Sequence, residues 1–154
     1  PSQEALVALV GKLGVYQVRL FPLRQGRERC LLLLFSPEKL TGLLREGQTA
    51  RTLAAMGYPC GSGLKALLSR LRRRCRRADF PHEIGFFLGY PYEDVMGFIQ
   101  YRGRNYKWAG LWKVYGDVGR AQCLCRQYTF CQQALGQHLD GGGSLEDFFL
   151  ERAE

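Results

Sequence analysis

The longest uninterrupted apolar run in this chain of 154 residues is CLLLLF, from Cys30 to Phe35. It is far shorter than the ~18 residues that suggest a membrane span. Its length suits a strand that is covered on both faces. The run therefore predicts a globular protein with a buried sheet, and no association with a membrane.

Segments of strand length alternate with amphipathic helical segments, and glycine or proline separates most of them. Alternating patterns and short apolar runs predict strands at residues 15–21, 29–35, 84–88 and 106–115. Spacings of three and four between apolar residues predict helices at 2–13, 37–46, about 49–56, 64–77, 91–102 and 118–139. This alternation favours an α/β or α+β fold, with about four strands in a mixed sheet covered by helices.

The predicted domain organisation is simple. Residues 1–140 form one domain, and residues 141–154 form a glycine linker and a short C-terminal helix at 145–150. Within the domain, the apolar sequence IGFFL predicts a central strand at Ile84–Leu88, because an edge strand would leave one face uncovered. Pro91 is expected to begin the next helix, and the strand ending at Tyr115 is expected to lie nearby.

A dense group of arginines dominates the charge of the chain, which is +8 at neutral pH. The predicted helix at 64–77 carries its apolar residues on one face and the arginines on the rest of its surface. The arginines are Arg70, Arg72, Arg73, Arg74, Arg76 and Arg77. Such a surface could bind nucleic acid or an acidic protein, but no aromatic residue or recognition motif accompanies it. A solvated basic face is the preferred interpretation.

The six cysteines show no spacing typical of a disulfide framework or a zinc site. Cys123 and Cys125 are two residues apart, and on a helix they would point to nearly opposite sides. No leader sequence of the secretory type is recognisable at the start of the chain. We therefore predict reduced thiols, a cytoplasmic location and no structural metal; no cofactor can be named.

The sequence FPHEIGFFLGYPYEDVMGFI, followed by GRNYKWAGLWKVYGD, resembles an uncharacterised family of small proteins from clostridia and related anaerobes. The resemblance rests on the signature HExGxFLGYPxxDVxGFI followed by WKVYG. The matching residues are His82, Glu83, Gly85, Phe87–Pro91, Asp94–Val95, Gly97–Ile99 and Trp112–Tyr115. It implies a cytoplasmic bacterial protein, possible links to iron or redox metabolism, and no particular reaction.

His82 and Glu83 are the candidate catalytic residues, since an imidazole can act as a base, an acid or a ligand near neutral pH. Adjacent residues entering a strand point to opposite faces, so the two are not expected to act on each other. The zinc-protease pattern HExxH is absent, because position 86 is a phenylalanine. A structural role for both residues, with Glu83 paired to an arginine, is the alternative.

The candidate ligand-binding residues are Tyr90, Asp94, Lys113 and Tyr115. Tyr90 follows a predicted strand and precedes a helix, which is where open α/β sheets often bind ligands. Lys113 and Tyr115 would share one strand face and could hold an anion. Three functions remain open: a ligand- or partner-binding accessory protein, an enzyme that uses His82, and a binder of nucleic acid or an acidic partner.

Overall fold

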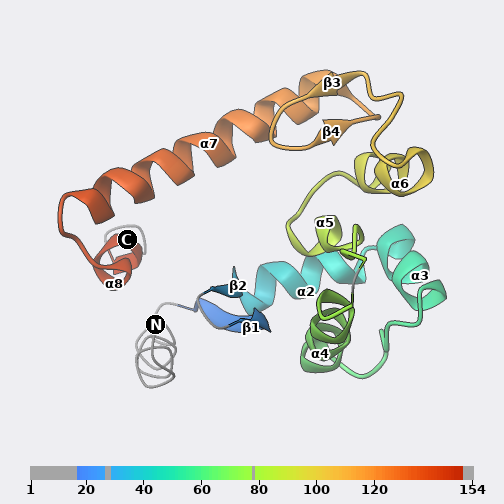
Figure 1. Cartoon of the computed structure of the whole chain (residues 1–154), viewed down its shortest axis with the longest axis horizontal. Helices are drawn as coiled ribbons and strands as arrows, with labels where there is room; N and C mark the ends of the chain where they lie inside the picture. The colour runs from blue at the N-terminus through green and yellow to red at the C-terminus, as the bar shows by residue number, and fades with distance from the viewer. Residues whose placement is uncertain (1–16, 27–28, 78, 151–154) are drawn as a thin grey trace.

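The computed structural model describes residues 17–26, 29–77 and 79–150, and the helix predicted at 2–13 lies outside them. Figure 1 shows a compact group of helices on one side and a long helix that extends from it. The elements are β1 (Arg19–Gln25), β2 (Cys30–Phe35), α2 (Pro37–Arg45), α3 (Gly47–Ala55), α4 (Leu64–Cys75), α5 (Ile84–Phe87), α6 (Tyr92–Tyr101), β3 (Trp108–Ala109), β4 (Lys113–Val114), α7 (Val118–Asp140) and α8 (Leu145–Leu150).

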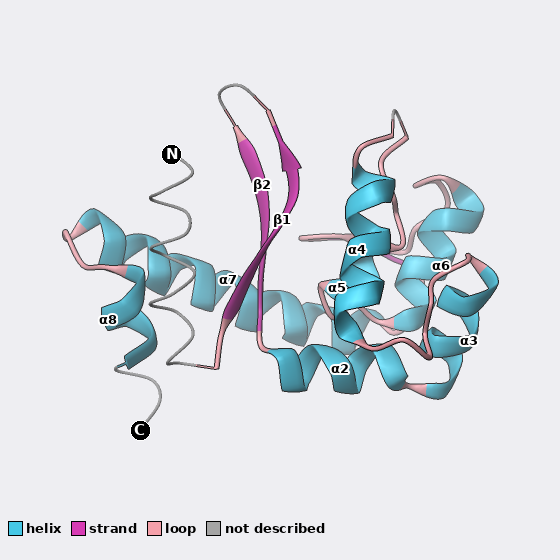
Figure 2. Cartoon of the chain, turned by 90° about the horizontal axis from the view of Figure 1, so that it is seen from below, coloured by secondary structure: helices cyan, strands magenta, loops and turns pink. Residues whose placement is uncertain are grey.

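The fold is mixed α+β, but the predicted four-stranded sheet is wrong. The described residues form two separate two-stranded antiparallel sheets, β1–β2 and β3–β4. In the first, Arg19 pairs with Phe35 and Gln25 with Cys30, with an irregularity between Pro22 and Arg24. Figure 2 shows this hairpin as a ribbon beside α4.

The prediction that β2 is covered on both faces is also wrong. Leu33 is buried, whereas Leu31 and Leu34 are 41% and 37% exposed. Its neighbour β1 packs against α4 through Leu23, which is buried. An apolar run is therefore not by itself proof of a strand that is covered on both faces.

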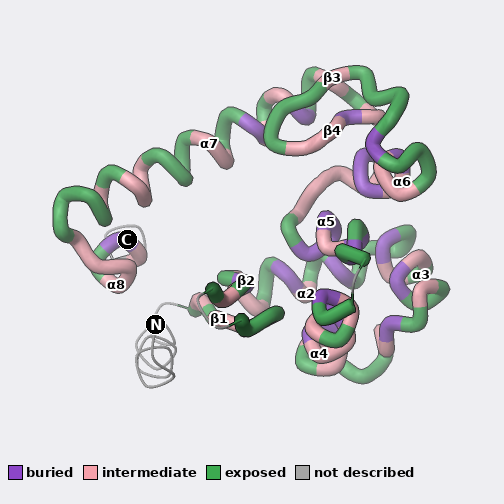
Figure 3. The backbone as a smooth tube through the Cα atoms, in the orientation of Figure 1, coloured by how far each residue is buried: buried purple, intermediate pink, exposed green. Residues whose placement is uncertain are grey.

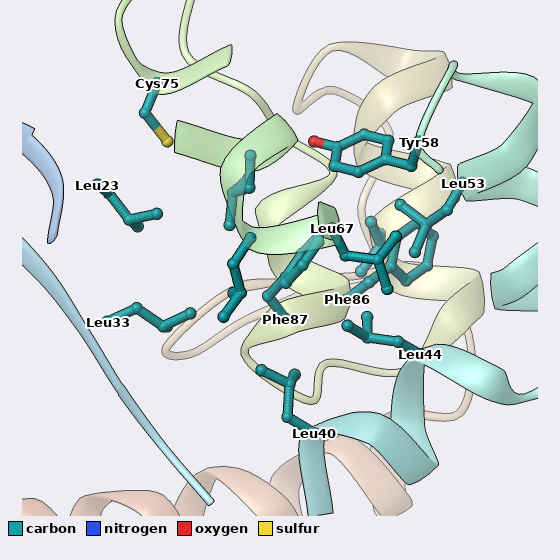
Figure 4. Packing of buried hydrophobic residues seen from close by; sticks show 13 residues of the cluster. Leu23, Leu33, Leu40, Leu44, Leu53, Tyr58, Leu67, Cys75, Phe86 and Phe87 are labelled. Atoms are coloured by element: carbon teal, nitrogen blue, oxygen red, sulfur yellow. The ribbon is translucent and has the colours of Figure 1, made fainter. Parts of the chain in front are cut away.

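The hydrophobic core lies between α2, α3, α4, α5 and α6 (Figure 4). The predicted stripe of α4 is confirmed, since its buried residues are Leu67, Leu68, Leu71 and Cys75. Helix α3 ends at Ala55, and Gly57, two residues later, has a φ of 80° and suits the left-handed position after a helix. Tyr58 then turns back into the core and is buried.

The segment Ile84–Leu88 is a short helix, α5, instead of the predicted central strand. Its turn begins at Pro81, whose carbonyl accepts a hydrogen bond from the Ile84 N–H at 3.1 Å. Phe86 and Phe87 are buried in the core. A Cβ on Gly85 would come within 2.8 Å of Val95 on α6, so the glycine allows the two helices to approach closely. An apolar run of this length does not distinguish a strand from a buried helical turn.

The strand predicted at 106–115 is a hairpin that turns at Gly110, where β3 pairs with β4. Helix α6 begins after Pro91, as predicted. The predicted start of α7 is confirmed, because the Asp117 carboxylate accepts a hydrogen bond from the Arg120 N–H at 3.0 Å.

Helix α7 is less buried than its apolar spacing predicts. Ala121 and Cys125 are its buried residues, and Leu139 is 42% exposed. Figure 3 shows α7 coloured mainly as intermediate or exposed along its length. At its end, the His138 ring bonds to the Ser144 carbonyl at 2.9 Å, and Ser144 and Asp147 exchange hydrogen bonds at the start of α8. The division of the chain at residue 140 stays a prediction. No helix in the described part of the chain has the length and apolarity that a membrane span requires.

Candidate functional site

A cavity of about 600 Å³ lies between the β1–β2 hairpin, α5, α6 and the turn of the β3–β4 hairpin. We call it the main cavity. Its walls are mainly apolar, and its volume is within the range of small-molecule sites. The apolar side chains on its walls include Leu23, Leu31, Leu33, Ile84, Leu88, Val95, Phe98, Leu111 and Trp112.

Four of the six residues predicted from the sequence as catalytic or ligand-binding line this one cavity: His82, Tyr90, Asp94 and Lys113. His82 and Tyr90 come from the two ends of the α5 segment, which the sequence analysis assigned to opposite ends of a strand. A short helix brings both ends to the same wall. Glu83 and Tyr115 do not line the main cavity.

Stacked aromatic rings form one wall. The rings of Tyr90 and Trp112 lie 4.4 Å apart between centroids and are nearly parallel, at 21°. The Tyr128 ring packs against Trp112, and its hydroxyl donates to the Gly89 carbonyl at 3.3 Å. Burial raises the pKa of the Tyr90 hydroxyl and of the Tyr128 hydroxyl. Both hydroxyls therefore stay protonated and uncharged near neutral pH.

Asp94 is a structural junction between α6 and the following hairpin. Its side chain is 2% exposed and accepts three hydrogen bonds of 2.8 Å. The donors are the Trp112 indole N–H and the backbone N–H groups of Tyr115 and Gly116. Both carboxylate oxygens thus already accept hydrogen bonds within the protein. This favours a structural role for Asp94 in the cavity wall, and not a direct contact with a ligand.

Lys113 and Tyr115 make contacts within the protein, and the anion site predicted from their shared strand face stays a prediction. The Lys113 ammonium donates to the Gly103 carbonyl at 2.7 Å and lies over the Tyr106 ring at 4.8 Å. Tyr115 packs on the ring of Tyr101, and its hydroxyl is buried without a hydrogen-bond partner. Lys113 thus holds the loop after α6 in place. It also lies in the wall of the main cavity.

His82 is exposed, and its ring lies 4.8 Å from the ring of Phe98 and 6.4 Å from that of Phe80. Among the described residues, no titratable side chain bonds to the imidazole. When a histidine acts as a general base that activates a nucleophile, a second titratable group usually lies within hydrogen-bond reach of its ring. Cys75 does not supply it, because burial raises the pKa of its thiol and keeps it protonated.

Glu83 is buried and paired, in agreement with the structural alternative. One carboxylate oxygen accepts from the Tyr58 hydroxyl and from Arg74 Nε, both at 2.9 Å. Burial alone would raise the pKa of Glu83, but the bonds from Arg74 and Tyr58 outweigh it and lower that pKa. The same contacts raise the pKa of Arg74, chiefly through the hydrogen bond to Glu83. This triad ties α4 to the segment that precedes α5.

A second cavity, of about 420 Å³, lies on the other side of His82. We call it the arginine cavity. It is lined by Met56, Arg70, Arg74, Asp79, Phe80, His82, Glu83 and Ile99. The sequence predicts Arg70 and Arg74 as part of a basic surface and does not reveal this cavity.

The six arginines of α4 and the residues after it therefore differ in environment. Arg70 and Arg74 face the arginine cavity, and Arg73, Arg76 and Arg77 are exposed. Arg72 is half-buried. Binding of nucleic acid or an acidic protein through these residues stays a prediction.

The described residues contain no group of three or more histidine, cysteine or acidic side chains that could hold a metal ion. All six cysteines are free in the structure.

Comparison with known proteins supplies a family. Residues 5–149 match the family described as "Protein of unknown function (DUF3793)", and the chain belongs to it. No curated protein and no solved structure shows a significant match to the chain.

Proposed function

We propose that this member of the DUF3793 family is a small cytoplasmic accessory protein that binds a planar, mainly apolar molecule in the main cavity. The supporting observation is the cavity itself, a space of about 600 Å³ bordered by apolar side chains and by the stacked rings of Tyr90 and Trp112. Flat aromatic faces favour flat ligands through stacking. The free state of all six cysteines is consistent with a reducing compartment.

Binding is favoured over catalysis because the charged groups of this cavity are committed to the fold and its histidine has no catalytic partner. Asp94 and Lys113 are used by internal hydrogen bonds, and the His82 ring has no titratable partner among the described residues. Conjugated planar rings are the reactive part of several organic redox cofactors. A ligand of this class would connect the protein with redox metabolism without a metal held by side chains.

The test uses pyrenebutanol, a neutral and fluorescent flat probe, titrated into the protein and followed by fluorescence anisotropy. The cavity is closed by Leu111→Trp, because Leu111 lines it and is 42% exposed, so that the larger ring can be accepted. Leu139→Trp is the matched control, with the same exposure but a position on α7 away from the cavity.

Wild type and Leu139→Trp are expected to bind the probe with the same affinity, and Leu111→Trp is expected to bind it at least about tenfold more weakly. Native mass spectrometry of the purified proteins should show any retained ligand in the first two and not in the third. Equal binding of pyrenebutanol by the two tryptophan variants would refute the proposed site.

A further inference from the structure

Arg70 is a partly buried cation that has no hydrogen-bond or ion-pair partner among the described residues. Its Nε lies out of contact with solvent, and no described residue offers it an acceptor. A buried charged donor that stays unpaired costs free energy, because it has lost water and gained nothing in return. The side chain is nevertheless held in a defined place: a Cβ on Gly57 would lie 3.3 Å from the Arg70 guanidinium, so the loop after α3 packs closely against it.

The neighbouring charges do not neutralise Arg70. Arg74, one turn further along α4, is paired with the buried Glu83. Asp79 also lines the arginine cavity, but it is exposed and forms no ion pair with Arg70 in the described part of the chain. The C-terminal end of α3, at Ala55, carries only a partial negative charge. Among the described residues that line the arginine cavity, Arg70 is therefore an arginine without an acceptor, whereas Arg74 is paired.

The two cavities meet at Phe80 and His82, which line both of them. Both residues are exposed, so the boundary between the cavities lies at the surface and not within the core. A molecule that occupies the main cavity can extend past His82 toward Arg70.

We infer that the ligand is an amphipathic anion, whose flat apolar body fills the main cavity and whose carboxylate or phosphate group bonds to Arg70. This inference rests on the proposed function and adds the charged group to it. Arginine suits this role because its planar guanidinium presents several N–H donors to an oxyanion. His82, at the junction of the cavities, offers a further hydrogen bond to the same group.

The experiment compares pyrenebutyrate with pyrenebutanol, two probes that share the ring and the chain and differ in the terminal carboxylate. Both are titrated into wild type, Arg70→Met and Arg73→Met. Methionine keeps an unbranched apolar stem and removes the charge, and Arg73 is an exposed residue of the same helix. The two variants therefore change the net charge equally.

Wild type is expected to bind pyrenebutyrate about tenfold or more tightly than pyrenebutanol. Arg70→Met should remove this preference without changing the affinity for pyrenebutanol, and Arg73→Met should preserve it. If Arg70→Met does not fold, Arg70→Lys and Arg73→Lys are compared instead. Arg70→Lys is expected to weaken the binding of pyrenebutyrate but not of pyrenebutanol, and Arg73→Lys is expected to change neither.

The outcomes separate the two proposals. If Leu111→Trp weakens pyrenebutanol binding but the Arg70 and Arg73 variants bind pyrenebutyrate equally, the assignment of Arg70 is wrong and the proposed function stands. If Leu111→Trp leaves the binding of both probes unchanged, the proposed function fails and the assignment of the anion site fails with it.

Discussion

Replacement of Asp94 by asparagine tests whether this carboxylate holds the wall of the main cavity. One oxygen, Oδ1, accepts from two backbone N–H groups, and the other accepts from the Trp112 indole. An asparagine can keep a carbonyl toward the backbone pair, but its amide N–H₂ then faces the indole N–H. One buried donor is left unsatisfied, at roughly 1–3 kcal/mol, and the two remaining bonds lose the strength that a charged acceptor gives them.

The smaller desolvation of a neutral side chain offsets part of this loss. We therefore expect Asp94→Asn to lower the free energy of unfolding by about 2–4 kcal/mol. For a chain of this size that corresponds to a fall in Tm of very roughly 5–15 °C. Thermal and urea unfolding measure the change, and the indole N–H resonance of Trp112 in an NMR spectrum should shift.

Glu93→Gln is the matched control. It also removes one negative charge from the first turn of α6, but Glu93 is exposed, so only the interaction with the helix dipole is lost, at about 0.3–1 kcal/mol. Similar losses in the two variants would mean that the three hydrogen bonds of Asp94 do not hold the hairpin, and the reasoning would be refuted.

Four further predictions concern the helical body and the cysteines. Leu71→Ala should lower the free energy of unfolding by ~2–5 kcal/mol in urea denaturation, since Leu71 is fully buried, whereas Arg73→Ala should change it by less than ~0.5 kcal/mol. Because the pKa of Glu83 is lowered in the folded protein, its carboxylate stabilises the fold above its ordinary pKa of 4.5 and loses this effect as the pH falls through the lower folded value. The difference in stability between wild type and Glu83→Gln should therefore be constant near neutral pH and shrink below 4.5; a difference that stays constant into acid would contradict it. Gly97→Ala should lower Tm, because its Cβ would overlap a tyrosine ring, while Gly42→Ala, with open space around it, should raise Tm slightly. Thiol counting on the denatured, unreduced protein should give six, and a count of two or fewer would contradict the cytoplasmic assignment.

The sequence predicts the long helices well and the strands poorly, for a physical reason. In α4 the apolar stripe repeats over three turns, so its buried face is readable from spacing alone. The segment Ile84–Leu88 is too short for such a repeat. Its helical form depends on contacts that are distant in sequence: Glu83 bonds to Tyr58 and Arg74, and Gly85 packs on Val95. No local pattern contains that information.

Four of the residues named from the sequence line the main cavity, although the predicted strand beside them is a short helix. The sequence predicts Tyr90 as a ligand-binding residue at the end of a strand. In the structure it lines the main cavity three residues after the end of the short helix α5. The sequence does not distinguish the role of Arg70 from that of Arg73, because both belong to one run of arginines. A signal was present: Arg70 and Arg74 lie beside the apolar stripe of α4, three residues after Leu67 and Leu71, whereas Arg73 is exposed.

The candidate residues divide according to whether the fold already accounts for them. Glu83 joins α4 to the start of α5, Asp94 joins α6 to the following hairpin, and Lys113 fastens the loop after α6. Each has its hydrogen bonds within the protein, so its presence needs no ligand. His82 and Arg70 form no side-chain hydrogen bond in the described part of the chain, although both line the arginine cavity. Polar groups that the fold leaves unused beside a cavity are the ones available to a ligand. For this reason the ligand assignment rests on the apolar walls and these two residues, and the remaining polar residues are assigned to the architecture that holds them.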